Sequence, residues 1–403
     1  MGLNWKVVLA ILTCNIFFMS ASYTMIVPFL PLYLTSELGV AQESVNLWSG
    51  VVFSATFLVS MFAAPVWGRL ADTRGKRLMA MRASFCLSLG YLLCGLVTTP
   101  MGLVGARMFM GFASGLWPMD LAIMTLVAPK EKLGWCLGVM QGVLTGSGVI
   151  GPLLGGALAE VFGMRVSFYI AAAALFLNFL IFTFVIKEPQ ASLRAMAEAR
   201  QKKRAKKSEP SVLKMPLLRN MLLCGALVQM TIMVLQPILT TYVEQLAGEM
   251  ENLVFVAGAV FSLGGIAGAL AAPFWGKFGQ RRGFFRSMVL ALLLAGVSML
   301  VQGTARTLLP FAAMQFVCGL FFCGVQPSIN AVLAEHSAPS IKGRIFGVLF
   351  SAQQVGSMAG PLLGGLVATA LGMHAVFFVA GAILLALGLA VRQKYLIGQG
   401  EAV

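Results

Sequence analysis

The chain has 403 residues, of which 59% are hydrophobic and only 11% are charged, and its formal net charge is +15. A soluble domain carries roughly 25% charged residues, so this composition excludes a soluble globular protein, a disordered protein and a secreted disulfide scaffold. The seven cysteines form no CxxC pair and there are only two histidines, so we expect no metal site, no disulfide framework and no cofactor.

Apolar runs follow one another along the chain, separated by short polar breaks. There are twelve of them, at residues 7–34, 45–67, 79–97, 101–127, 135–159, 166–186, 218–243, 252–275, 285–302, 307–331, 345–371 and 376–391. We read each run as one membrane-spanning helix, because a helix needs about 20 apolar residues to cross the hydrocarbon core. The first run continues well beyond the length of a signal-peptide core, so we read it as a retained helix. The predicted fold class is therefore an all-α integral membrane protein.

Positive charge marks one side of the membrane. Of the 29 lysines and arginines, all except Arg107, Arg165 and Arg306 lie at the termini or beside the connections between runs 2–3, 4–5, 6–7, 8–9 and 10–11. Cytoplasmic connections carry an excess of Lys and Arg, so we expect both termini in the cytoplasm. The net charge is then a signal of topology, and we expect no nucleic-acid partner.

One long polar segment, residues 188–217, divides the chain into an N-terminal six-helix bundle (1–187) and a C-terminal six-helix bundle (218–403). Its composition allows either an amphipathic helix on the membrane surface or a solvated tether. The two halves repeat each other: residues 65–68 (PVWG) match 273–276 (PFWG), and the offset between matching motifs stays at 208 to 209 residues. Parallel six-helix repeats predict two bundles that rock about a cavity near the membrane midplane, as in secondary transporters.

The connection between the second and third runs is a short basic turn, GRLADTRGKR, at residues 68–77. It resembles the GxLaDrxGrkr motif of the major facilitator superfamily, and of its twelve-helix drug:proton antiporters in particular. Thr73 departs from the motif, because a basic residue is usual there. The resemblance implies a charge relay that controls conformation, formed by Gly68, Asp72, Gly75, Lys76 and Arg77. We expect Asp72 to reach the start of the eleventh helix, near 342–346.

Arg107 lies within the fourth run, in a segment that resembles the family motif lxxxRxxxGxxxG, whose arginine is tied to proton coupling. A charged side chain near the bilayer centre costs some 2.5 kcal/mol or more, so a buried arginine needs a reason. The alternative is that Arg107 extends to the nearby membrane interface, as long basic side chains do.

Asp120 is the only carboxylate within any of the twelve runs. An ionised aspartate there costs a few kcal/mol unless it is paired or hydrated. Three roles remain open for it: a proton relay, a contact with the basic turn at 68–77, and direct binding of a cationic substrate.

The fifth run carries a pattern that resembles the antiporter signature gxxxGPxxGG, with Ser147 in place of the first glycine. Its remaining members are Gly151, Pro152, Gly155 and Gly156. Small residues four apart let two helix backbones touch, so packing alone could require these glycines. The Gly-Pro pair is typical of exporters within the family.

Helices 1, 4, 7 and 10 line the substrate cavity in this superfamily, and uncharged amides occur in these runs. Five of these amides are expected to line the substrate cavity: Asn15, Gln229, Gln236, Gln315 and Gln326, although amides that only join helices would give the same pattern. The cavity then suits bulky amphipathic compounds. There is no GxxxxGK[ST] phosphate loop, so the energy must come from an ion gradient or from the substrate's own gradient.

We therefore predict a proton-coupled efflux transporter, not an enzyme, that exports small lipophilic or cationic compounds by alternating access. Its expected partners are the small-molecule substrate, protons and the lipid bilayer, and we expect a monomer in the inner membrane. The alternative is a dedicated exporter of one metabolite, such as a siderophore, a sugar or an amino acid.

Overall fold

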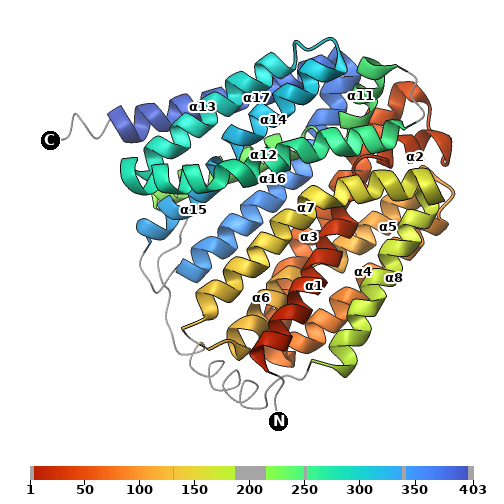
Figure 1. Ribbon diagram of the computed structural model, residues 1–403, viewed down its shortest axis with the longest axis vertical. Coiled ribbons are helices and arrows are strands. Elements are labelled where there is room, and N and C mark those ends of the chain that lie inside the picture. The colour runs from red at the N-terminus through yellow and green to blue at the C-terminus, as the bar shows by residue number, and fades with distance from the viewer. Residues whose placement is uncertain (1–3, 130, 187–214, 249–251, 338–341, 398–403) are drawn as a thin grey trace. The chain divides into compact units, whose positions relative to one another are not determined.

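The computed structural model describes residues 4–129, 131–186, 215–248, 252–337 and 342–397, and all regular structure in these ranges is helical (Figure 1). Within them, twelve helical spans are long and apolar enough to cross a membrane, as the sequence predicted. Short 3-10 and π turns lie at Gln42–Ser44 and Gln393–Ile397. The predicted linker at 188–217 lies almost entirely outside the described residues.

Four helices are uninterrupted over 30 residues each: α3 (Val45–Arg74), α7 (Leu133–Phe162), α12 (Leu253–Arg282) and α16 (Lys342–Leu371). Each leads through one residue into the next helix: α4 (Lys76–Leu96), α8 (Met164–Phe184), α13 (Phe284–Gln302) or α17 (Met373–Arg392). That residue is a glycine with φ between 87° and 98°: Gly75, Gly163, Gly283 and Gly372. Glycine adopts positive φ without a steric cost, which allows a turn of a single residue.

The other four spans are each broken into two helices. The pairs are α1 (Trp5–Thr24) with α2 (Leu30–Ser36), α5 (Pro100–Phe112) with α6 (Leu116–Val127), α10 (Pro216–Met233) with α11 (Leu239–Ala247), and α14 (Leu308–Phe322) with α15 (Val325–Glu335). The prediction of one continuous helix for each of these runs was wrong. Pro28 and Pro237 stand in two of the breaks, where each removes a backbone donor.

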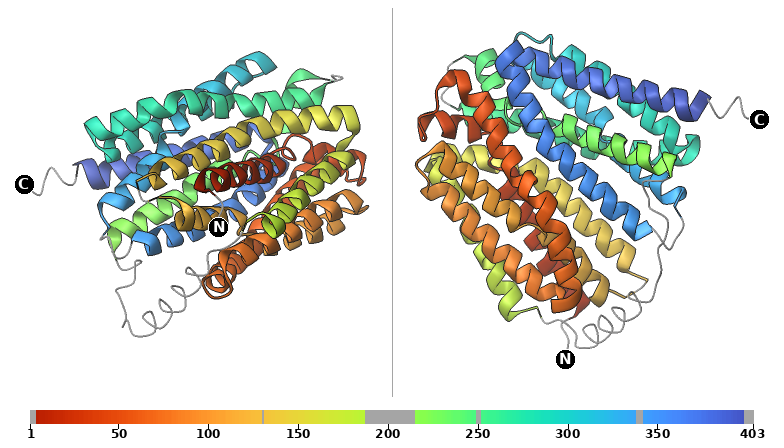
Figure 2. Two further views of the ribbon diagram at one scale, coloured as in Figure 1. Left: turned by 60° about the horizontal axis from the view of Figure 1, so that its bottom comes forward. Right: turned by 180° about the vertical axis from the view of Figure 1, so that it is seen from behind.

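The chain divides into two compact units. Unit 1 comprises Met1–Ile26 and Ala55–Pro210, and unit 2 comprises Val27–Ser54 and Ser211–Val403. In unit 1, α1 packs along α7 and α4 packs along α8 (Figures 1 and 2). In unit 2, the repeat-equivalent helices pair in the same way, α10 with α16 and α13 with α17. The sequence repeat is therefore also a repeat of helix packing.

Candidate functional site

The break between α5 and α6 is held by side chains from two neighbouring helices of unit 1. Gly115 has a φ of 113°, which interrupts the helical ladder and leaves carbonyl groups without helical partners. Trp67 Nε1 donates to the Phe112 carbonyl at 2.7 Å. The Arg82 guanidinium donates to the same carbonyl at 3.3 Å and to the Ser114 carbonyl at 2.8 Å, and it lies 3.7 Å from the centre of the Trp67 ring. The stacked side chains of Arg82 and Trp67 thus donate hydrogen bonds to the carbonyls that the break leaves without helical partners.

Arg107 lies on α5, in a closely packed part of unit 1. Its side chain is only 1% exposed, so the guanidinium is enclosed by protein and does not extend to the surface. Tyr91 and Cys94, both buried on α4, are among its neighbours. Gly111 brings α5 close to α3, since a Cβ added there would collide with the Thr56 carbonyl.

Asp120 lies on α6, just after the break, and is completely buried. Asn15 Nδ2, from α1, donates to both carboxylate oxygens, at 2.9 Å and 3.0 Å. Asn178 of α8 donates to the backbone carbonyl of Asn15 at 3.4 Å. The side-chain oxygen of Asn15 is also buried and has no hydrogen-bond partner among the described residues. The partner of the carboxylate is thus an amide, not a basic side chain of the 68–77 turn.

The 68–77 turn ties α4 to the end of α8. Gly75 allows α4 to begin directly after α3, and Arg77 then extends to the last turn of α8. Its Nε donates to the Phe182 carbonyl at 3.0 Å, and its Nη2 donates to the Thr183 carbonyl at 2.5 Å. A cation at a helix C-terminus stabilises the exposed carbonyls.

The other members of the turn are less enclosed. A Cβ added to Gly68 would meet nothing within 4 Å, and Lys76 is half-buried. The side chain of Asp72 lies outside the described part of the chain, as do those of residues 342–344. The predicted contact of Asp72 with the start of α16 therefore stays a prediction.

The glycines of α7 lie against α1. A Cβ added at Gly155 would come within 2.6 Å of the Met25 backbone, and one at Gly151 would come within 3.1 Å of the backbone of α1. Pro152 and Gly156 are buried beside them. The equivalent glycines of α16 approach α10 in the same way. These positions therefore set the spacing between two helices in each unit.

The four glutamines of unit 2 that were predicted to line a cavity differ from one another in their surroundings. Gln236 lies in the break between α10 and α11, is 3% exposed, and its side-chain oxygen has no partner among the described residues. The same is true of the oxygen of Gln326, which stands just after the α14–α15 break. Gln315 accepts from Gln302 at 2.6 Å and so joins α14 to α13. Gln229 is half-buried on α10.

Arg82 was counted only among the basic residues beside the connection between the second and third runs, and its contact with the break was not predicted. Arg82 lies inside α4 and binds the break between α5 and α6. Its position within the apolar run 79–97 is the signal that could have identified it, since a basic residue inside a span needs a partner.

Comparison with known proteins gives one consistent result along the chain. A family model described as Major Facilitator Superfamily matches residues 12–301 and 221–395. Multidrug resistance protein MdtG of Dickeya zeae (strain Ech586) is 35% identical over 386 residues, which cover 95% of this chain and 93% of that protein. MdtG of Yersinia enterocolitica serotype O:8 / biotype 1B is 34% identical over 387 residues, which cover 95% and 92%.

Solved structures share the fold at low sequence identity. A bacterial homolog of the human lysosomal transporter Spinster, in an inward-facing and occupied conformation, has a TM-score of 0.80 at 16% identity and covers 97% of both chains. The nucleoside transporter NupG has a TM-score of 0.72 at 15% identity and covers 98% of this chain and 99% of its own.

Proposed function

Because the chain belongs to the major facilitator superfamily, we propose that it is a multidrug efflux transporter, which exports small lipophilic or cationic compounds in exchange for protons. The 35% identity to an MdtG along 95% of the chain carries this proposal. Its twelve spans make it a multi-pass membrane protein. We place it in the inner membrane as a monomer with both termini in the cytoplasm, and the halves 1–187 and 218–403 alternate access to the cavity.

Asp120 is the proton carrier in this proposal, and Asn15 is its partner in both protonation states. While the carboxylate is charged, Asn15 Nδ2 donates to both of its oxygens. Once protonated, the carboxyl group becomes a donor, and a rotated amide offers its Oδ1 as the acceptor. That Oδ1 is buried and has no other partner among the described residues, so it is available for this exchange.

Protonation changes how strongly α1 is tied to α6. Hydrogen bonds to a charged group contribute about 1.5–3 kcal/mol, whereas neutral ones contribute about 0.5–1.5 kcal/mol. Loss of the charge on Asp120 therefore weakens the contact with Asn15. Asn178 donates to the backbone carbonyl of the same residue. Arg107, enclosed on the other side of the break, is the second charge that a proton cycle can use.

Substrate recognition in this proposal is assigned to uncharged groups. The unsatisfied oxygens of Gln236 and Gln326 stand at helix breaks and accept hydrogen bonds from the N–H or ammonium groups of a bound compound. Aromatic and aliphatic surfaces supply most of the remaining contact area in such pockets.

Transport in proteoliposomes with an imposed pH gradient tests the proposal, with the lipophilic cation ethidium as the probe. Asp120→Asn keeps the side-chain volume but cannot carry a proton. We expect this variant to lose uphill, proton-driven transport and to retain downhill exchange. The control is Glu131→Gln, which neutralises an exposed carboxylate and should behave as wild type.

Three outcomes for Asp120→Asn would redirect the proposal, and one for the wild-type protein would contradict it. Impaired exchange as well would assign Asp120 a structural contact, and a loss confined to cationic compounds would assign it to substrate binding. Unchanged pH-driven transport by Asp120→Asn would remove the carboxylate from the coupling mechanism. Wild-type protein that transports neither ethidium nor a neutral lipophilic probe would contradict multidrug efflux itself.

A further inference from the structure

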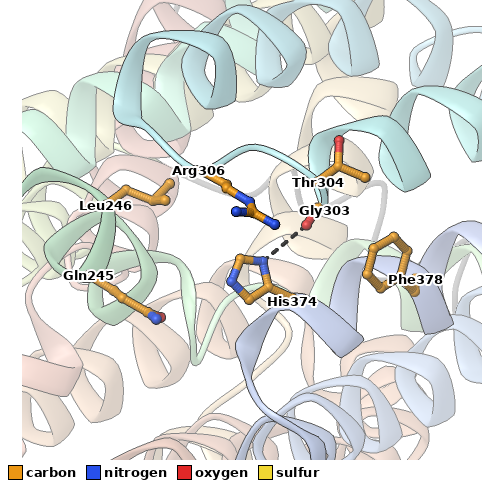
Figure 3. A pocket seen from close by; sticks show the side chains of 7 residues that line it. All are labelled: Gln245, Leu246, Gly303, Thr304, Arg306, His374 and Phe378. Carbon is orange, nitrogen blue, oxygen red and sulfur yellow. Dashed lines mark hydrogen bonds between the residues drawn. The ribbon is translucent and has the colours of Figure 1, made fainter.

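A cavity of about 480 Å³ opens at one end of unit 2, away from the residues discussed above (Figure 3). It lies between α11, the connection from α13 to α14, and the first turn of α17. Its lining is formed by Gln245, Leu246, Gly303, Thr304, Arg306, His374 and Phe378. Cavities of roughly 300–1,000 Å³ are of the size that holds small molecules, so this cavity can accept a ligand.

The hydrogen bonds of His374 fix which ring nitrogen carries the proton. Its Nδ1 lies 3.0 Å from the Gly303 carbonyl oxygen and 2.9 Å from the Tyr242 hydroxyl. A carbonyl can only accept, so Nδ1 is the donor, and Tyr242 gives its own proton to the Ala305 carbonyl at 3.1 Å. In the neutral form of the ring the lone pair is therefore on Nε2, on the side of the ring where Gln245 lies (Figure 3).

Arg306 supplies positive charge to the same space. In the view of Figure 3 its guanidinium lies above the His374 ring, and the Gln245 side chain lies on the other side of the ring. Within the described residues, no carboxylate and no hydrogen bond holds this exposed guanidinium. The cavity thus combines a cation, an amide donor and a ring nitrogen that accepts.

The equivalent position in unit 1 carries different side chains. There the Gly95 carbonyl accepts from Arg165 Nη1 at 3.3 Å and from the Tyr169 hydroxyl at 3.0 Å. At the repeat offset, Gly95 and Arg165 correspond to Gly303 and His374. The contact of the α17 start with this carbonyl thus belongs to the duplicated fold, whereas the lone pair on Nε2 is new in unit 2.

Two further replacements distinguish the cavity from its counterpart. Phe378 stands where unit 1 has the hydroxyl-bearing Tyr169, and Arg306 stands where unit 1 has Thr98. Arg306 makes no hydrogen bond or ion pair within the described residues, so its guanidinium is available to a ligand.

The cavity also lies where lipid headgroups are expected. Its residues cluster at the ends of three spans, Phe284–Gln302, Leu308–Glu335 and Met373–Tyr395. Close by in the chain are strongly exposed apolar side chains, Leu309 at 80% and Leu371 at 72%. A guanidinium at the ends of membrane spans can pair with the phosphate of an anionic headgroup.

We propose that this cavity binds a phosphoglycerol group. The phosphate pairs with the Arg306 guanidinium, which matches two of its oxygens, and accepts from the Gln245 amide. A glycerol hydroxyl donates to His374 Nε2. The same chemistry is offered by the headgroup of an anionic lipid and by soluble glycerol phosphate, so the experiment has to distinguish the two sources.

Binding to the purified full-length protein in detergent tests the site, with native mass spectrometry as the readout. The probes are dioleoyl phosphatidylglycerol, dioleoyl phosphatidic acid, which has the phosphate without the second glycerol, and sn-glycerol 3-phosphate. We expect wild type to prefer phosphatidylglycerol over phosphatidic acid. Binding of glycerol phosphate as well would indicate a soluble source, and binding of the lipid alone would indicate the membrane.

Three variants separate the parts of the site. Arg306→Gln should weaken binding of phosphatidylglycerol about tenfold or more, as expected for the loss of charge-assisted hydrogen bonds. Gln245→Glu places a negative charge on an exposed residue opposite Arg306 and should weaken binding similarly. His374→Arg introduces the residue that bonds the equivalent carbonyl in unit 1, so it should keep the fold and abolish the preference for phosphatidylglycerol.

The matched control is Arg281→Gln, which removes one positive charge from the last turn of α12 and should bind as wild type. Wild-type affinity in both Arg306→Gln and Gln245→Glu would overturn the proposal. A preference for phosphatidylglycerol that survives in His374→Arg would overturn the assignment of the hydroxyl to Nε2.

Discussion

The α5–α6 break of unit 1 and the α14–α15 break of unit 2 are built on one plan. In each, an indole nitrogen donates to a freed carbonyl over 2.7 Å, from Trp67 to Phe112 in unit 1 and from Trp275 to Leu320 in unit 2. Both the donors and the acceptors are 208 residues apart. The two copies of the sequence have thus kept the same way of holding a bent helix.

The breaks differ in the charges around them. At the same offset, the ionisable residues Arg82, Arg107 and Asp120 of unit 1 correspond to Leu290, Gln315 and Ser328 of unit 2. In unit 2, Ser328 Oγ donates to the Gly324 carbonyl at 2.7 Å, so neutral groups satisfy this break. The comparison teaches that a bend can be held without a charge: in unit 1 Arg82 helps to hold it, whereas Arg107 and Asp120 bind none of its carbonyls and serve another purpose. We assign that purpose to proton coupling.

The glycine packing that both units share predicts the largest effect. Gly155→Leu would push a side chain into the Met25 backbone and should cost about 3 kcal/mol of unfolding free energy, with loss of transport. Gly364→Leu, against the Val234 backbone in unit 2, should cost a similar amount. Melting temperature in detergent and uptake into proteoliposomes are the measurements.

A control on the same helix makes this prediction specific. A Cβ added at Gly148 meets nothing within 4 Å, so Gly148→Leu should melt and transport as wild type. Equal stability of Gly148→Leu and Gly155→Leu would contradict the close approach of α1 to α7.

Arg82→Leu makes the first break resemble the second and should have the next largest effect. It removes two charge-assisted hydrogen bonds and a cation–π contact, and we expect a loss of about 2 kcal/mol in stability. Arg82→Lys keeps the charge without the forked geometry and should lie between this variant and wild type. Thermal unfolding followed by circular dichroism measures both. If Arg82→Leu melts like wild type, Trp67 alone holds the break.

The two indoles predict the smallest effect and the most direct test of the shared plan. Trp67→Phe and Trp275→Phe each remove one hydrogen bond and keep a ring, and each should lower stability by about 0.6 kcal/mol, the average for polar contacts between membrane helices. Chemical unfolding in mixed micelles can compare the pair side by side. A loss from one variant only would show that the two breaks are not held alike.

The spans, the repeat and the glycine positions could be predicted because they depend on composition and local spacing. Length and hydropathy identified the twelve runs, and small residues four apart indicated helix contacts on α7. Asp120 was identified by charge alone, since no other carboxylate lies within a run.

The breaks and the partners could not be predicted, because they depend on contacts between distant residues. Gly111 and Gly115 are the same residue type within one run, but only Gly115 has positive φ. The difference is set by Trp67, 45 residues before the carbonyl it binds, and by Arg82. Likewise, Asn15 was predicted to contact substrate, and the structure pairs it with a residue 105 positions away.

The single-residue turns at Gly75, Gly163, Gly283 and Gly372 have a consequence for synthesis and movement. A connection of one residue is too short to let one helix shift along the other. We therefore expect each pair to insert into the bilayer as a helical hairpin and to keep its relative position afterwards. The broken helices are joined by longer stretches, such as residues 97–99 and 128–132 on either side of α5 and α6. The described helices thus form four hairpins with single-residue turns and four broken spans, and the breaks are the places where a span can bend.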